Sequence, residues 1–245
     1  MSARNLLMLL ITAGFILSPL SGVAGNKKIM TTRAAKVLAE RGIVESIYGL
    51  KIRSTESVQD MIAAGFHGKT ESKTKAEIRG IKISEIVYDK KRDIAKATAT
   101  ITLNKFTGID GNELDFHGKT FTRVGFATST PAMAGPLQAL RAAELDGYKQ
   151  LAKRIVGFTL ESQTTVENYI MKSDLVKSKV LATIYLARVT DYGWDDSGDA
   201  YVKMAIDTDE VSEILGQQIV DVDKVIEVEG QGAQADDYSQ AKSGK

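Results

Sequence analysis

Two copies of the pentapeptide Phe-His-Gly-Lys-Thr contain the chain's two histidines, at Phe66–Thr70 and at Phe116–Thr120. Gly-Lys-Thr closes a phosphate-binding loop when a glycine stands five residues before the Gly-Lys pair, because backbone amides must wrap around the phosphates. Ala63 and Glu113 occupy those positions, so the sequence predicts no nucleotide site. A metal shared by the two histidines would need a third ligand, and none is indicated. A turn used twice is the simpler interpretation.

An acidic segment further along the chain offers oxygen atoms that could bind calcium. Carboxylates in a glycine-containing loop are calcium ligands, but the spacing here departs from the EF-hand pattern and no bidentate glutamate follows at the required distance. We therefore predict a solvated hairpin turn. The aspartates concerned are Asp191, Asp195, Asp196 and Asp199.

The remaining acidic candidates lie on expected helices. Glu40, Glu45 and Glu144 each stand close to Arg or Lys, which favours surface charge pairs. No Ser-His-Asp arrangement is expected, because both histidines lie in turn-like segments. The sequence therefore predicts a non-enzymatic protein with no catalytic, cofactor-binding or metal-ligating residues and no cofactor.

Composition and charge exclude several classes of protein. The 245 residues include 32 Lys and Arg and 31 Asp and Glu, for a net charge of +1, so there is no basic excess of the kind that binds nucleic acid. The hydrophobic content of 43% and the charged content of 26% are typical of a soluble globular chain. The absence of cysteine excludes disulfides and also excludes the lipid-modified cysteine of a lipoprotein.

The N-terminus has the pattern of a secretory signal peptide. Arg4 supplies the positive end, Leu6–Leu17 supplies an apolar stretch, and Pro19 interrupts it before the small residues Ser21–Ala24. We expect residues 1–24 to be removed and the mature chain to be a soluble periplasmic protein with no transmembrane helix. An uncleaved membrane anchor is the alternative, but the apolar stretch is short for a bilayer span.

An internal repeat organises the chain. Arg33-Ala34-Ala35 recurs as Arg141-Ala142-Ala143, 108 residues later, and the register continues without a gap for about 26 residues. In this register Gly49 falls on Gly157, and apolar positions stay apolar. The sequence therefore predicts an α+β fold of two related small domains, each a helix-strand-helix-hairpin unit with helices packed on an antiparallel or mixed sheet.

Each predicted domain has the same order of elements. The first, residues 30–104, begins with a helix capped by Thr31 or Thr32 and ended by Gly49. Its elements are a helix at Arg33–Tyr48, a strand at Leu50–Ser54, a helix at Glu56–Ala64, and strands at Ile78–Val87 and Ile94–Leu103. Residues 105–136 are expected to form a hairpin of Leu114–Phe116 and Phe121–Phe126, followed by a linker at Ser129–Pro136.

The second predicted domain covers residues 137–229. Gly157 ends its first helix, Thr164 or Thr165 caps the next one, and Asp207 opens a capping box. Its elements are a helix at Leu137–Val156, a strand at Phe158–Ser162, a helix to Val176, strands at Ile184–Trp194 and Ala200–Ile206, a helix ending at Gly216, and a strand within Ile219–Val228. Residues 230–245 are expected to be a disordered tail.

The second copy resembles a known family. Arg141–Ala152, Ile155–Gly157, Ala187–Val189 and Tyr201–Ile206 resemble the outer-membrane lipoprotein family of about twenty kilodaltons, which is related to the N-terminal domain of flagellar assembly protein T. The shared pattern is an alanine-rich helix that begins with Arg-Ala, a glycine, a strand, a second helix and a closing hairpin. The first copy fits this pattern more loosely, so the family domain would be present twice.

The resemblance implies a non-enzymatic cell-envelope protein, often part of assemblies at the outer membrane. Some members of that family belong to rings or disks around the flagellar basal body. The chain lacks the anchoring cysteine of a lipoprotein, which favours a soluble periplasmic protein, as in flagellar assembly protein T. The family pattern has no catalytic positions, so the resemblance transfers no functional residue.

Residues and resemblance together predict a periplasmic structural or assembly protein. Its expected partners are proteins of the envelope, including flagellar basal-body or outer-membrane proteins, and further copies of itself in a homo-oligomer. Sheet edges and helix faces would make the contacts. The alternative is a periplasmic binding module for a small ligand or peptidoglycan, with Trp194 and Tyr192 as stacking platforms and Trp194 otherwise a core anchor.

Overall fold

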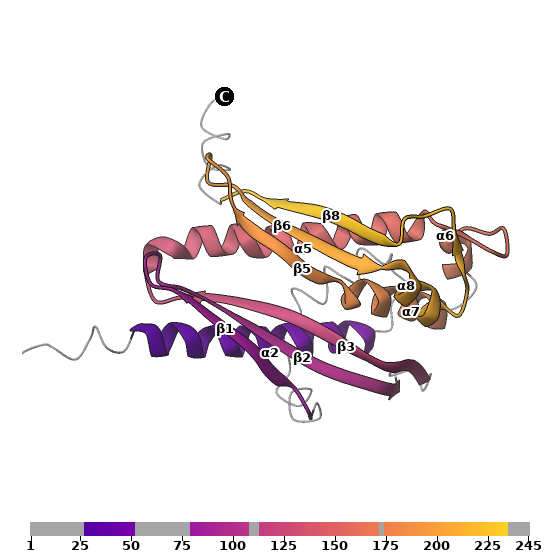
Figure 1. Cartoon of the computed structure of the whole chain (residues 1–245), viewed down its shortest axis with the longest axis horizontal. Coiled ribbons are helices and arrows are strands. Elements are labelled where there is room, and N and C mark those ends of the chain that lie inside the picture. The colour runs from indigo at the N-terminus through magenta and orange to yellow at the C-terminus, as the bar shows by residue number, and fades with distance from the viewer. Residues whose placement is uncertain (1–26, 52–78, 108–112, 172–173, 235–245) are drawn as a thin grey trace, which may run out of the picture.

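Two units, each a long helix packed on a three-stranded antiparallel sheet, make up the described structure (Figure 1). The computed structural model describes residues 27–51, 79–107, 113–171 and 174–234. The predicted α+β fold class is confirmed, because antiparallel sheets carry helices on one face in both units. The internal repeat and the domain boundaries stay predictions.

The first unit places helix α2 on the sheet β1-β2-β3. Ala35 and Ala39 of α2 are fully buried, and they contact Gly125 of β3 so closely that a β-carbon there would overlap the helix backbone. Small residues on both sides therefore let helix and strand approach. The elements are α2 (Lys27–Lys51), β1 (Lys82–Asp89), β2 (Ile94–Thr107) and β3 (Glu113–Thr128).

Helix α2 is longer than predicted at both ends. It begins at Lys27, so Thr31 and Thr32 lie inside it, and Thr32 Oγ1 donates to Lys28 O instead of capping the N-terminus. It also continues through Gly49 to Lys51, so the predicted stop at Gly49 and the start of the predicted strand Leu50–Ser54 are wrong. A single glycine weakens a helix only slightly, so the helix can continue through it when the helix packs on a sheet. The predicted helix Glu56–Ala64 lies outside the described residues.

The predicted hairpin of Leu114–Phe116 and Phe121–Phe126 is wrong. Both segments belong to the single strand β3, which pairs antiparallel with β2 along its whole length. His117 and Gly118 have φ values of 48° and 76°, and the register shifts opposite them, so they form a bulge rather than a reversal. The strands and turn predicted around Asp89 and Asp93 are confirmed, although β1 begins four residues later than Ile78.

The second unit places helix α5 on the sheet β5-β6-β8, and three short helices lie at one end. Leu140, Ala143, Leu151 and Ile155 are among the residues that α5 buries. The elements are the 3₁₀ turn η2 (Pro131–Met133), α5 (Ala134–Val156), β4 (Thr159–Leu160), α6 (Val166–Ile170), α7 (Asp174–Leu186), β5 (Arg188–Trp194), β6 (Ala200–Asp207), α8 (Thr208–Leu215), β7 (Ile219–Val220) and β8 (Val225–Gly232).

Local signals in this unit predict the caps better than the strand bounds. Thr165, one of the two predicted caps, caps α6. Asp207 caps α8 as predicted, but it accepts from the N–H of Asp209 instead of the Glu210 N–H that a capping box would use. Helix α8 ends at Gly216 with φ of 68°, as predicted. The predicted strand from Ile184 is wrong at its start, because Ile184 lies in α7, and the strand predicted at Phe158–Ser162 shortens to β4.

The segment after residue 229 begins as a strand. Gly230 and Gly232 belong to β8, so the predicted disordered tail is wrong at its start. Both glycines lie against α5, where a β-carbon would overlap the backbone of Ala139 or Ala143. Sequence polarity does not reveal this strand, because glycine adds nothing to an apolar pattern.

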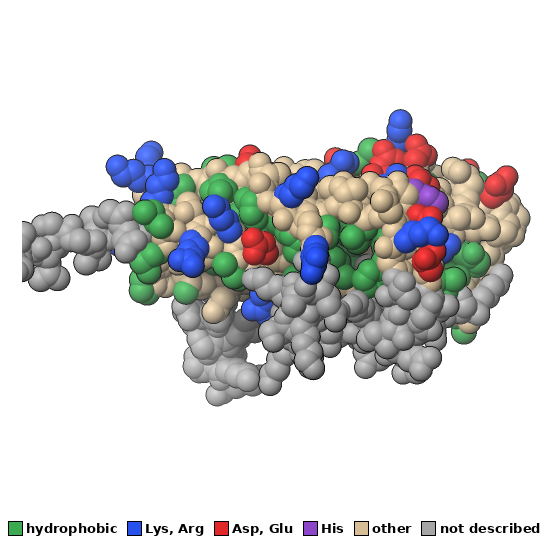
Figure 2. Space-filling model, turned by 90° about the horizontal axis from the view of Figure 1, so that it is seen from below, with side chains coloured by type: hydrophobic (Ala, Val, Ile, Leu, Met, Phe, Trp, Pro, Cys, Tyr) green, Lys and Arg blue, Asp and Glu red, His purple; other side chains and the backbone are tan. Residues whose placement is uncertain are grey.

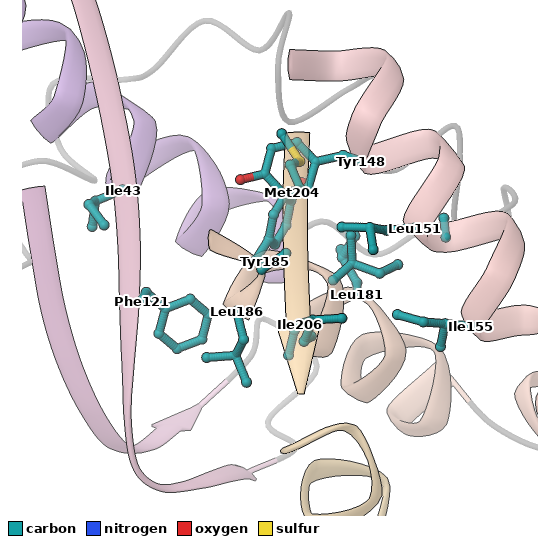
Figure 3. Close-up of a cluster of buried hydrophobic side chains, with 14 of the residues drawn as sticks. Ile43, Phe121, Tyr148, Leu151, Ile155, Leu181, Tyr185, Leu186, Met204 and Ile206 are labelled. Carbon is teal, nitrogen blue, oxygen red and sulfur yellow. The ribbon is translucent and has the colours of Figure 1, made fainter. Parts of the chain in front are cut away.

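One cluster of buried apolar side chains includes residues of both units. Figure 3 shows its centre, where Ile43 of α2, Phe121 of β3 and Tyr185 of α7 converge with side chains from α5 and β6. The two units therefore share a core. Burial of this cluster is the main stabilising contribution to the fold.

Candidate functional site: the groove between α2 and α5

A groove of about 480 Å³ runs along the junction between the two units. Helices α2 and α5 form its walls, and residues 124–128 of β3 form its floor. The helices run in the same direction, as Figure 1 shows. Leu38, which is 41% exposed, and Leu137 give the walls an apolar character, while Arg41 and Arg141 lie on opposite walls.

Ion pairs join the two walls. Glu45 of α2 accepts from Arg41 Nε at 2.7 Å and also from Arg141 of α5. Glu144 accepts from Arg141 at 2.6 Å. Burial alone would lower the pKa of Arg141, but the carboxylates of Glu144 and Glu45 outweigh it and raise that pKa. The guanidinium of Arg141 is therefore held between two helices, so its position is fixed by both units.

Arg123 lies beneath these ion pairs, with only 2% of its surface exposed. Its Nη1 is 3.6 Å from Glu144 Oε1, and its Nε donates to Gly42 O at 3.5 Å. The guanidinium lies 4.3 Å from the ring centroid of Tyr148 and 5.4 Å from that of Tyr185. Burial lowers the pKa of Arg123 and raises the pKa of Tyr185 to about 12, so Tyr185 is neutral. Aromatic faces and a carboxylate thus accommodate the buried cation.

Asp93 ties together the other end of the junction, where both helices begin. Its carboxylate accepts four hydroxyl hydrogen bonds, at 3.0, 3.0, 2.6 and 2.8 Å, from Thr31, Tyr88, Ser129 and Thr130 in that order. Burial opposes ionisation, but these hydrogen bonds outweigh it and hold the pKa of Asp93 well below its usual range. Asp93 therefore stays ionised and joins α2, β1 and the segment that leads into α5.

Of the residues considered for chemistry from the sequence, Glu45 and Glu144 line this groove, whereas His117 and the aspartates near the turn between β5 and β6 do not. His117 is exposed in β3 at the bulge, with Nδ1 3.4 Å from Asp115 Oδ1, and the other histidine lies outside the described residues. Because β3 continues through this segment as a strand, the geometry is not that of a phosphate-binding loop. Within the described ranges, no group of three or more His, Asp or Glu side chains could hold a metal ion.

The acidic segment forms the predicted hairpin turn between β5 and β6. Asp195 Oδ1 accepts from the backbone N–H groups of Ser197 and Asp199, both at 3.0 Å, and from Ser197 Oγ at 2.7 Å. The Ser197 hydroxyl and the turn amides lower the pKa of Asp195. This carboxylate closes the turn on itself.

Trp194 and Tyr192 pack against other parts of the chain. Trp194 Nε1 donates to Pro136 O at 3.0 Å, which anchors β5 to the start of α5. The Tyr192 ring packs on Phe126 of β3 with centroids 4.5 Å apart, and the ammonium of Lys96 lies 5.8 Å from its centroid. The expected anchoring role of Trp194 is confirmed, and Tyr192 links the two sheets.

Sequence reasoning missed Asp93 and Arg123, and it treated Glu45 and Glu144 as surface residues although both are buried. One signal was present. Arg123 lies two residues from Phe121, at the position in an alternating strand that should face the core. A charged residue there indicates a buried ionic contact. Asp93 carried no such signal, because aspartate is common in turns.

Scans of protein families, curated proteins and solved structures found no match to this chain. Among the described helices, none combines the length and apolar character that a membrane span requires. The groove, the ion pairs and the sheet edges are thus the features from which a function must be argued.

Proposed function

We propose that this chain is a non-enzymatic structural or assembly protein of the cell envelope, exported to the periplasm, where it docks on protein partners. The signal-peptide pattern of residues 1–24 supports the export, and the family resemblance supports an envelope assembly that includes a flagellar basal-body ring or disk. The groove and the exposed sheet edges are the surfaces that would dock.

The main support for this proposal is that the buried polar side chains contact other groups of the same chain. Every buried polar or charged side chain of the described residues contacts another group of this same chain: Thr31, Glu45, Ser46, Asp93, Arg123, Glu144, Thr183, Thr208 and Ser212. Catalytic sites place such groups at a cleft with pKa values near the working pH. Here Asp93 is held ionised by hydroxyl groups from α2, β1 and the segment before α5, so it serves to join elements.

The groove offers a partner a rigid surface. Its walls are helices fixed by ion pairs, and its apolar side chains are exposed enough to be buried by a docking partner. The volume also lies in the range of small-molecule sites, about 300 to 1,000 Å³, which is the observation that favours the alternative of a ligand-binding module.

Fractionation of cells that express the full chain tests the proposal. We expect a chain shortened at its N-terminus, released with the periplasm and recovered in a complex larger than a monomer. Leu38→Asp or Leu137→Asp should reduce that complex at least about ten-fold, because each places a charge in an apolar contact. Met171→Asp is the control, since Met171 is 83% exposed after α6, outside the groove and outside the strands.

Retention of the full-length chain in the cytoplasm would contradict this proposal. A periplasmic monomer that binds peptidoglycan and loses that binding on Trp194→Ala would favour the binding module instead.

A further inference from the structure

Strand β1 forms an open edge of the first sheet. The order β1-β2-β3 leaves one side of β1 without a partner strand among the described residues. Figure 1 shows β1 on the side of its sheet away from β5, whereas β3 lies at the junction with the second unit. An open edge presents backbone donors and acceptors to any strand that can match it.

The regular part of β1 is apolar for an edge. Ile86 is 42% exposed and Val87 is 46% exposed, on opposite faces of the strand. Figure 2, which shows the molecule from below, has exposed hydrophobic side chains lying among scattered lysines and arginines. A bulge at Ser84 interrupts only the start of β1, so the pairing of Glu85–Asp89 with β2 is regular. The usual protection of edges by bulges and charges is thus incomplete here.

Pairing with β2 defines the two faces of β1. Ile83, Ile86 and Tyr88 lie opposite the buried alanines of β2, on the face toward α2. The other face carries Lys82, Glu85, Val87 and Asp89. Antiparallel strands that continue one sheet must match face to face.

We infer that the edge of β1 binds the same edge of a second copy of this chain, antiparallel, about a two-fold axis through Ile86. This inference rests on the proposed assembly function and names the partner as the chain itself. Ser84 is the extra residue of the bulge and has no partner in β2, so it is also left out of this register. In the register that remains, both members of every pair lie on the same face. The pairs are Ile86–Ile86, Glu85–Val87, Ile83–Tyr88 and Lys82–Asp89.

Charge complementarity supports this register. Lys82 is exposed and lies at one end of β1, and Asp89 lies at the other, so self-pairing brings the two together twice. Asp89 uses Oδ1 for the turn amides of Lys91 and Arg92, at 2.8 and 3.2 Å. Glu85 already pairs with Lys96 of β2 at 3.0 Å, so its charge is compensated within the chain.

The other outward edge lacks this complementarity. β8 carries Glu227 and Glu229 on one face, and an antiparallel pairing of β8 with its copy about Val228 would place these carboxylates opposite each other. Like charges directly opposite are destabilising. In this register β8 is therefore less well matched to its own copy than β1 is.

A cysteine substitution tests the axis directly, because the chain has no cysteine of its own. Directly opposite residues of antiparallel strands are about 4.5–5.5 Å apart at Cα, within the reach of a disulfide. Under mild oxidation, Ile86→Cys should form a covalent dimer at least about ten-fold faster than Val225→Cys, a control of similar exposure on β8. Equal rates would overturn the inference.

A charge exchange tests the register. Lys82→Asp alone and Asp89→Lys alone should each weaken the homodimer about ten-fold, since each places like charges opposite each other at both ends. An equimolar mixture of the two variants should recover dimerisation, because both ends are then complementary. Light scattering over about a hundred-fold range of concentration measures this, and melting curves confirm that each variant folds.

The outcomes separate this inference from the proposed function. A chain that stays monomeric at every concentration, yet joins a periplasmic complex through the groove, overturns only the β1 pairing. A chain that dimerises through β1 but remains in the cytoplasm overturns only the envelope function.

Discussion

At the residue scale, Asp93 is a structural carboxylate in an unusual backbone position. Its φ of 53° lies in the left-handed region, which aspartate and asparagine tolerate better than most residues. The side chain is 8% exposed and gathers four hydroxyl groups from three parts of the chain. The turn thus serves tertiary structure as well as chain reversal.

Asp93→Asn should destabilise the protein by about 2–3 kcal/mol at neutral pH. The amide is neutral and offers one acceptor atom, whereas the carboxylate is charged and offers two. Asparagine keeps the left-handed backbone, so the change isolates the hydrogen bonds. Chemical denaturation of both proteins measures the difference. Asp196→Asn, on the exposed turn between β5 and β6, is the control and should change stability by less than about 0.5 kcal/mol.

The same residue gives a pH dependence of known sign. The folded pKa of Asp93 lies below the unfolded value of 3.8, so its contribution is complete above that value and is lost as pH falls toward the folded pKa. The stability gap between wild type and Asp93→Asn should therefore narrow from about pH 7 to about pH 3. A gap that widens on acidification would contradict the assignment.

At the element scale, the close approach of helix and strand is the shared construction of the two units. Gly125 meets the carbonyl of Ala35 and the amide of Ala39, and Gly230 meets the carbonyl of Ala143 and the amide of Gly147. The helix positions of these contacts are 108 residues apart, the spacing of the sequence repeat. A glycine in the third strand thus sets the helix–sheet distance in each unit.

Gly125→Ala and Gly230→Ala should each destabilise the fold by about 3 kcal/mol or more, because the new methyl group meets helix backbone that cannot rotate away. Gly157→Ala is the matched control. Gly157 has φ of −78°, and a β-carbon there would lie 3.5 Å from the nearest atom, Arg154 O, so it should be tolerated. Thermal unfolding compares the three variants, and equal losses would show that the close approach is not the cause.

At the scale of the whole molecule, charged side chains join two units that also share an apolar core. Arg123 and Glu144 connect β3 with α5, and Lys119 connects β3 with Glu213 of α8 at 2.6 Å. The first pair is buried and the second is partly exposed. Removing one partner of the buried pair should destabilise the fold strongly, because the other charge is left buried without it. Replacing both partners by apolar residues should cost much less.

Glu144→Leu should cost about 3–5 kcal/mol, because the buried guanidinium of Arg123 loses that carboxylate. The double variant Arg123→Met with Glu144→Leu should recover a large part of the loss, since it removes both charges. A double-mutant cycle by denaturation measures the coupling. Glu213→Gln, at the exposed pair, should cost less than about 1 kcal/mol. A double variant less stable than Glu144→Leu would contradict this account.

The sequence by itself determined the local features of this protein. The caps at Thr165 and Asp207, the stop at Gly216 and the turn at Asp195–Asp199 depend on neighbours a few residues away, so their signals are readable in the chain.

Only the tertiary structure decided the rest. Whether Gly49 ends a helix, whether His117-Gly118 reverses a strand, and whether Gly230 belongs to a sheet each depend on a partner element far away in sequence. The burial of Glu45, Asp93 and Arg123 depends on two units meeting side by side. Backbone and side-chain preferences are weak beside the free energy of packing, so the contacts of the folded chain override them.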